Sequence, residues 1–169
     1  MSDFLQAFEA MIVNEGGYVL HTVPGDRGGM TYAGISRRAH PDWTGWVDLD
    51  AGRRPEAERV RAMYKRLYWD RLRLDEVESQ RIARTLFDFA VNAGPATAAK
   101  LAQVIVGATP DGVVGPRTLT ALNTADPDRF ALAYALAKIA RYRDIVTRDR
   151  SQAKFLLGWI NRTLKEAAA

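Results

Sequence analysis

The sequence contains no cysteine and only two histidines, His21 and His40, among its 169 residues. Without cysteine the chain forms no disulfide, no thiolate metal site and no thiol nucleophile, so packing alone must stabilise its fold. The histidines are widely separated and have no ligand-spaced partner, which argues against a zinc site. Gly28-Gly29 lacks the spacing and the following lysine of a phosphate-binding loop. We therefore expect a protein that uses no metal, nucleotide or other cofactor.

Long hydrophobic runs are absent as well. No segment approaches the roughly 18 apolar residues that a membrane-spanning helix needs. The first residues, Met1–Phe4, lack the basic stretch and the apolar run of a secretory signal. We expect a protein made in the cytoplasm without a signal peptide and not stably inserted in a membrane. If its target lies outside the membrane, another factor must release it.

The charge balance is moderately basic, with a net charge of +4 and a pI near 9.6. Such a balance favours a polyanionic partner such as nucleic acid, an anionic membrane or a bacterial wall. The arginines are scattered rather than clustered, however, which is typical of a solvated surface. Hydrophobic residues make up 47% of the chain, enough to bury a core in one compact domain or in two small ones.

Apolar residues at helical spacing predict a mainly α fold. The first helix starts from a Ser2 or Asp3 cap and stops at Gly16-Gly17. From there to about Gly52 the chain is rich in glycine, proline and aspartate, and we interpret it as an irregular active-site region with room for a small hairpin. Its β-capable pieces are Thr31-Tyr32 and Trp43–Val47. The remaining helices are predicted over 55–68, 80–93, 96–106, from 116, over 126–147 and over 152–165.

Glu15 is the first candidate for chemistry. It follows Ile12, Met11 and Phe8 at helical spacing, which places its carboxyl on or beside the apolar stripe at the C-terminal end of the first helix. Burial and the negative end of the helix dipole would both raise its pKa. A carboxylic acid that stays protonated near neutral pH is what cleavage of a glycosidic bond needs. The alternative is a surface residue at a fraying helix end.

Several segments, in order along nearly the whole chain, resemble glycoside hydrolase family 108. The members of that family are peptidoglycan N-acetylmuramidases of bacteria and phages, and a predicted peptidoglycan-binding region follows their catalytic part. The resemblance starts with Glu-Gly-Gly at 15–17. The segments that resemble the family are Asn14–Tyr18, Pro24–Ile35, Tyr64–Trp69, Leu86–Gly94, Asp111–Leu119 and Phe155–Arg162.

The resemblance implies that Glu15 is the catalytic acid. The lysozymes of T-even phages use a Glu, an Asp and a Thr in the order in which this chain offers Glu15, Asp26 and Thr31, although the spacing differs. Asp26 would position or deprotonate a water in an inverting enzyme, or attack the sugar in a retaining one; alternatively, it caps the turn Pro24–Gly29. Thr31 would orient the water, or is a plain strand residue.

Candidate substrate-binding residues lie in two places. Asp88 and Asn92, four residues apart on one helix face, would hydrogen-bond to sugar groups; alternatively, Asn92 only helps to end the helix before Gly94-Pro95. Aromatic side chains offer flat faces for sugar rings, but at helical spacing they are more often core, so we expect one or two of these four to face substrate. The four are Tyr18, Tyr32, Tyr68 and Trp69.

The resemblance implies hydrolysis of the β-1,4 bond between N-acetylmuramic acid and N-acetylglucosamine, in a lysozyme-like helical globule. We expect a muramidase region over 1–92 and a helical peptidoglycan-binding region over 93–169, packed into the same globule. The expected partner is bacterial peptidoglycan, with no nucleic acid, in the periplasm, reached as a monomeric endolysin with a holin for release. Two alternatives stay open: a lytic transglycosylase at the same bond, and a non-catalytic wall-binding or secretion-accessory protein.

Overall fold

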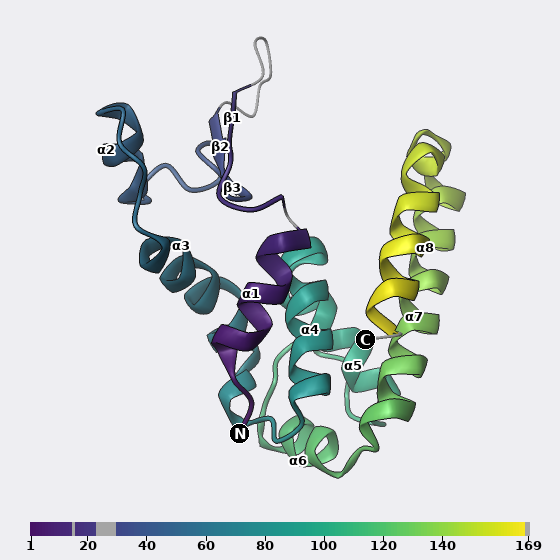
Figure 1. Ribbon diagram of the computed structural model, residues 1–169. Helices are drawn as coiled ribbons and strands as arrows, with labels where there is room; N and C mark the ends of the chain where they lie inside the picture. Colours follow the sequence, from purple (N-terminus) through teal and green to yellow (C-terminus); the bar gives the residue numbers. More distant parts are fainter. Residues whose placement is uncertain (15, 23–29, 168–169) are drawn as a thin grey trace.

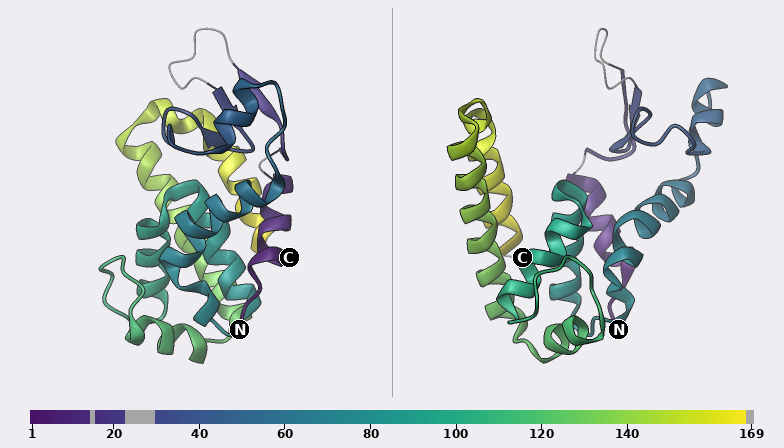
Figure 2. Two further views of the ribbon diagram at one scale, coloured as in Figure 1. Left: turned by 90° about the vertical axis from the view of Figure 1, so that its left-hand side faces the viewer. Right: turned by 180° about the vertical axis from the view of Figure 1, so that it is seen from behind.

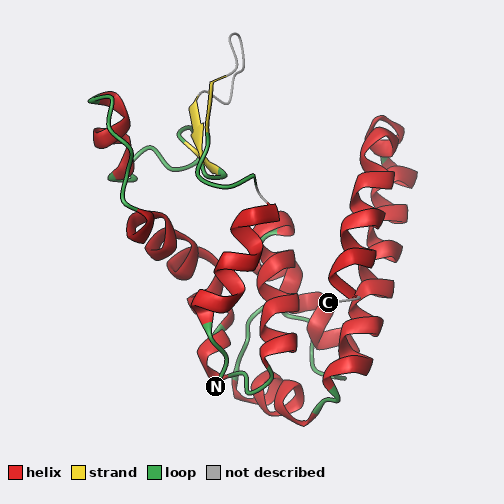
Figure 3. Ribbon diagram, viewed as in Figure 1, coloured by secondary structure: helices red, strands yellow, loops and turns green. Residues whose placement is uncertain are grey.

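The computed structural model describes residues 1–14, 16–22 and 30–167, and it is mainly helical (Figures 1 and 3). The helices are α1 (Phe4–Asn14), α2 (Gly45–Asp50), α3 (Ala57–Tyr64), α4 (Gln80–Ala93), α5 (Pro95–Ile105), α6 (Pro116–Thr124), α7 (Pro127–Arg148) and α8 (Ala153–Ala167). A small antiparallel sheet has the order β1 (Leu20–Thr22), β2 (Met30–Tyr32), β3 (Ile35–Ser36). None of the described helices is both long and apolar enough to cross a membrane.

Helices α1 and α4 form the centre of the molecule and run in the same direction (Figure 1). The Asp3 carboxylate caps α1 by accepting the Leu5 amide at 2.8 Å, as predicted for a helix starting here. The starts of the two helices are tied together, because the Asp3 amide donates to Gln80 Oε1 at 2.5 Å and the Gln80 side chain donates back to the Asp3 carbonyl. The two C-terminal ends, at Asn14 and Ala93, therefore lie at the same end of the molecule.

Helix α4 has neighbours on several sides and defines the core. Ser79 caps it by accepting the Ile82 amide. Phe87 packs edge-on against Trp69, with ring centroids 5.6 Å apart, and Phe89 packs edge-on against Tyr134 of α7 at 5.7 Å. One buried cluster thus joins residues from the first half and from the second half of the chain.

Two arms rise from this centre, and Figure 2 shows them from the side and from behind. One arm is the antiparallel pair α7 and α8. The other contains the sheet and α2, and it connects to the centre through α3 (Figure 1). The C-terminal ends of α1 and α4 lie at the base between the arms.

The structure corrects the prediction that Trp43–Val47 is a β-capable piece. Trp43–Val47 does not form a strand; its last residues belong to the short helix α2. The helical geometry brings Trp43 and Trp46 together, with ring centroids 5.0 Å apart, and lets the Trp46 indole donate to the His40 carbonyl at 2.7 Å. Two tryptophans spaced three apart can share one buried side on a helix but not on a strand.

The helix predicted from Pro55 to about Tyr68 also differs. It is divided into α3 and a π-helical turn over Lys65–Trp69, which places the Trp69 indole in the core.

Candidate active site

The C-terminal end of α1 is closed by two glycines. The Gly16 amide donates to the Val13 carbonyl at 3.2 Å, and the Gly17 amide donates to the Ile12 carbonyl at 2.9 Å. Both glycines have positive φ, +87° and +77°, which a residue with a Cβ adopts only under strain. The chain therefore turns away from α1 at this point, directly after the position of Glu15 in the sequence.

The catalytic predictions are only partly within the described residues. Glu15 and Asp26 lie outside them, so their predicted roles stay predictions. Thr31 lies in the middle of β2, where it pairs with His21 of β1 and with Ser36 of β3. Its side chain is half-buried. The strand position agrees with the alternative role, and a contact with the reacting groups stays a prediction.

Two of the predicted sugar-stacking aromatics are buried instead. Trp69 is fully buried between Phe4 and Phe87, and its indole donates to Asp75 Oδ1 at 2.7 Å. Tyr32 is 2% exposed and stacks on Trp43. A ring face covered by other side chains cannot stack on a sugar, so we correct the prediction for both residues.

The other two predicted aromatics, Tyr18 and Tyr68, are half-buried. Burial first, and the carboxylate of Glu9 second, raise the pKa of Tyr18, while Arg61 lowers it. Tyr18 follows Gly17 and is the aromatic residue nearest in sequence to the end of α1. It therefore stays a candidate for contact with substrate.

Asp88 and Asn92 lie on one face of α4, as predicted, but their surroundings differ. Asp88 is buried, at 5% exposure, and its pKa is raised to about 7, because burial first and Glu166 second outweigh the opposing effect of Arg84, Lys138 and Arg162. Asn92 is exposed in the last turn of α4, at the same end as the C-terminus of α1. Its amide nitrogen donates to the Asp88 carbonyl at 2.8 Å, and its oxygen accepts a hydrogen bond from Arg162 of α8.

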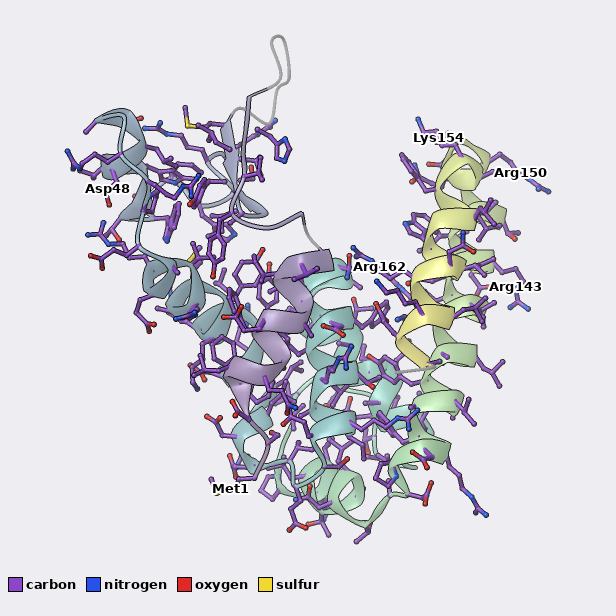
Figure 4. The ribbon with its side chains drawn as sticks, in the orientation of Figure 1. Met1, Asp48, Arg143, Arg150, Lys154 and Arg162 are labelled. Atoms are coloured by element: carbon purple, nitrogen blue, oxygen red, sulfur yellow. The ribbon has the colours of Figure 1, made fainter. Side chains whose placement is uncertain are left out.

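Asn92 lies at the edge of a groove of about 460 Å³ between the end of α4 and the α7–α8 arm. The Trp159 ring forms one wall and is flanked by Tyr142 and Phe155, at 5.1 Å and 5.9 Å between centroids. Arg162 points from α8 toward the end of α4 (Figure 4). A row of aromatic rings beside a guanidinium and an amide suits a polymer of acylated sugars that also bears carboxylates.

The sequence alone did not predict that Phe155, Trp159 or Arg162 of α8 contributes to a groove. These residues belong to the segment Phe155–Arg162, which resembles a peptidoglycan-binding region as a whole. The Arg162–Asn92 contact spans 70 residues of sequence, so no local pattern reveals it. The only local signal was the spacing of Phe155, Trp159 and Arg162, which places the three on one helix face.

The tip of the same arm is rich in cations. Arg150 and Lys154 project from the tip in Figure 4, Arg148 lies at the end of α7, and Arg143 projects lower on the arm. Arg143 is 73% exposed and pairs with Asp144, while the Lys154 ammonium lies over the Phe155 ring. The arm therefore presents positive charge and an aromatic face together. Within residues 1–14, 16–22 and 30–167, no three His, Cys, Asp or Glu side chains gather as metal ligands would.

The Asp111-Gly112 turn is held from within. Gln103, 1% exposed, donates from its amide nitrogen to Asp111 Oδ1 at 2.7 Å and accepts the Gly112 amide at 2.9 Å. Asp111 also accepts the Val113 amide. These bonds explain the turn as a structural element that precedes α6.

Comparison with known proteins agrees with this architecture. A family model described as Glycosyl hydrolase 108 matches residues 8–94, just over half of the chain, and a model described as Predicted Peptidoglycan domain matches residues 94–164. The solved structure of Brucella abortus SagA is similar with a TM-score of 0.74 and 26% identity, over 98% of this chain and 91% of that one. No curated protein matches the sequence. The protein therefore belongs to the glycosyl hydrolase 108 family, has its lysozyme-like, mainly α fold, and is a glycoside hydrolase that acts on peptidoglycan.

Proposed function

We propose that the protein is an N-acetylmuramidase that hydrolyses the β-1,4 bond between N-acetylmuramic acid and N-acetylglucosamine. The observation that best supports this is the position of the groove. It opens beside Asn92, at the end of the molecule where α1 ends and where the chain continues into the Glu-Gly-Gly motif. A glycan lying against Trp159 would thus approach the segment that contains the proposed acid.

The proposed chemistry uses two carboxyl groups and one hydroxyl. Glu15 donates a proton to the leaving glycosidic oxygen, and Asp26 and Thr31 manage the attacking water or stabilise the oxocarbenium-like transition state. Asn92 and Tyr18 contact the sugar. The Arg162 guanidinium and the cationic tip of the α7–α8 arm attract the carboxylates of the wall polymer.

The test is digestion of purified peptidoglycan by the wild type and by Glu15→Gln, with the new ends identified by a reducing-sugar assay and mass spectrometry. We expect reducing N-acetylmuramic acid ends from the wild type and at least about a hundredfold slower release from the variant, because a general acid contributes about that much or more. The matched control is Glu58→Gln, which makes the same change at a side chain that is 75% exposed on α3.

The products separate the alternatives. Anhydro ends, with Asp26→Asn as active as the wild type, would identify a lytic transglycosylase. Binding of the wall without release of any sugar end would identify a non-catalytic wall-binding protein. A folded Glu15→Gln that cleaves as fast as Glu58→Gln would refute the proposed role of Glu15.

We also propose that the enzyme acts as a monomer on the wall in the periplasm, as an endolysin released by a holin would. Sedimentation of the purified protein tests whether it is a monomer. Wall lysis with and without membrane permeabilisation tests whether it needs release across the membrane.

A further inference from the structure

A second cavity, of about 490 Å³, lies between α1, α4 and the C-terminal end of α8. It is separate from the groove at Asn92, because the two share no lining residue. A volume of this size accommodates a ligand of one or two amino acids. The polar side chains that line it and matter here are Gln6, Arg81, Arg84, Thr85, Asp88 and Glu166.

The wall of this cavity contains two buried polar atoms without a hydrogen-bond partner. One is Asp88 Oδ1, an acceptor on a side chain that is only 6% exposed. The other is Arg81 Nε, a donor. Buried polar groups are nearly always paired, because each unpaired one costs the free energy of its lost hydration. Two side chains that line one cavity and each keep a buried polar atom without a partner, an acceptor on Asp88 and a donor on Arg81, point to a polar ligand at this place.

The other polar side chains of the cavity wall do not occupy Arg84 or Asp88, so both can bind a ligand. Glu166 is engaged by Lys138 in a buried ion pair, and Gln80 is engaged by the backbone of Asp3. The Arg84 Nε atom lies 3.7 Å from Asp88 Oδ2, which is too long for a hydrogen bond. A cation and an anion one helical turn apart, neither fully satisfied, match the two termini of a very short peptide.

We propose that this cavity binds a zwitterionic dipeptide or amino acid, with its ammonium group at the Asp88 carboxylate and its carboxylate at the Arg84 guanidinium. The Gln6 amide and the Thr85 hydroxyl line the same cavity and offer further hydrogen bonds. The peptides of the bacterial wall are the expected source of such ligands, an assignment that rests on the proposed function. The binding site itself does not depend on that function.

Binding should depend on pH through Asp88. Burial and Glu166 raise the pKa of Asp88 to about 7, and the opposing cations are Arg84 of α4, Lys138 of α7 and Arg162 of α8. Helix α1 contributes no ionisable side chain to the cavity wall. The carboxyl is then about one tenth ionised at pH 6 and about nine tenths ionised at pH 8, so an ammonium ligand should bind up to roughly tenfold more tightly at pH 8.

The experiment is an NMR titration of the full-length, ¹⁵N-labelled protein with D-alanyl-D-alanine at pH 6 and pH 8. We expect shifts at the amides of Gln6, Ala10 and Thr85, and a dissociation constant that falls by roughly five- to tenfold from pH 6 to pH 8. Asp88→Asn should remove the pH dependence and weaken binding at pH 8 by about tenfold or more, and Arg84→Gln should weaken it similarly at both pH values.

Matched controls are Asp144→Asn and Arg143→Gln, which make the same charge changes in an exposed pair on α7. Both should bind the dipeptide as the wild type does. The proposal is overturned if the cavity amides do not shift at millimolar dipeptide, if the N-acetylated dipeptide amide binds as tightly as the free dipeptide, or if Asp88→Asn binds like Asp144→Asn. The probe has no glycosidic bond, so a failure of the muramidase proposal would leave this result unchanged.

Discussion

Replacing Asp88 by Asn should stabilise the protein at alkaline pH. Asp88 has a normal pKa of 3.8 when the chain is unfolded and a pKa of about 7 in the fold, because burial and Glu166 disfavour its charged form. The folded protein therefore holds a proton that the unfolded chain releases between these two pH values. The stabilisation from this carboxyl is complete below about pH 4 and is lost as the pH rises to about 7. Asparagine has nearly the same shape and no charge to bury.

The expected change in the free energy of unfolding follows from the difference between the two pKa values of Asp88. One pKa unit corresponds to about 1.36 kcal/mol, so the full shift amounts to about 4 kcal/mol of lost stability at pH 8. Between pH 5 and pH 8 only the part of the shift that lies above pH 5 counts, about two units, which gives roughly 3 kcal/mol. The free energy of unfolding of Asp88→Asn minus that of the wild type should therefore rise by about 3 kcal/mol from pH 5 to pH 8.

Urea unfolding followed by circular dichroism measures this difference, with m-values checked for equality between the proteins. Asp144→Asn is the control, since it makes the same substitution at a carboxylate that is 47% exposed instead of buried. The reasoning is wrong if Asp88→Asn is less stable than the wild type at pH 8. It is also wrong if the difference between the two proteins is the same at both pH values.

Three other substitutions test parts of the fold and of the groove. Gly45→Ala should destabilise the arm that contains α2 by about 1–3 kcal/mol, because a Cβ at this position would lie 2.3 Å from the Trp43 ring; tryptophan fluorescence during thermal unfolding measures it. Gln103→Ala should cost about 2 kcal/mol or more by leaving buried partners unpaired, and a midpoint of urea unfolding equal to that of the wild type would contradict this. Trp159→Ala, combined with Glu15→Gln to prevent cleavage, should weaken cosedimentation with peptidoglycan about tenfold without a large loss of stability.

Most of the helices could be predicted from the sequence, because local signals mark where they begin or end, but α2 could not. Asp3, Ser79 and Asp126 cap their helices through side-chain hydrogen bonds, and the paired glycines end α1 where the apolar periodicity stops. The residue types of Trp43–Val47 favour a strand when each is considered alone. The packing of two indoles on one side decides the conformation of that segment.

The site was harder to predict, for a physical reason. Burial separates a sugar-stacking aromatic from a core aromatic, and the burial of Trp69 depends on Phe4 and Phe87, which are distant in sequence. Similarly, the surroundings of Asp88 come from α7 and α8, the last helices of the chain. Composition and spacing identified Asp88 and Asn92 as one functional face of α4. They could not predict that the two side chains line two different cavities.

Helices α7 and α8 are attached to the centre by different kinds of contact. Helix α7 packs through Phe130 and Tyr134, and the Tyr134 hydroxyl donates to the Ala98 carbonyl at 3.0 Å. Helix α8 meets α4 through Arg162 and Asn92, beside the ion pair of Lys138 with Glu166. Helix α8 also rests Trp159 on Tyr142 of α7, but Thr163 is its only fully buried side chain among the described residues. We therefore expect the amide hydrogens of α8 to exchange with solvent faster than those of α7, because opening the outer helix exposes fewer buried side chains.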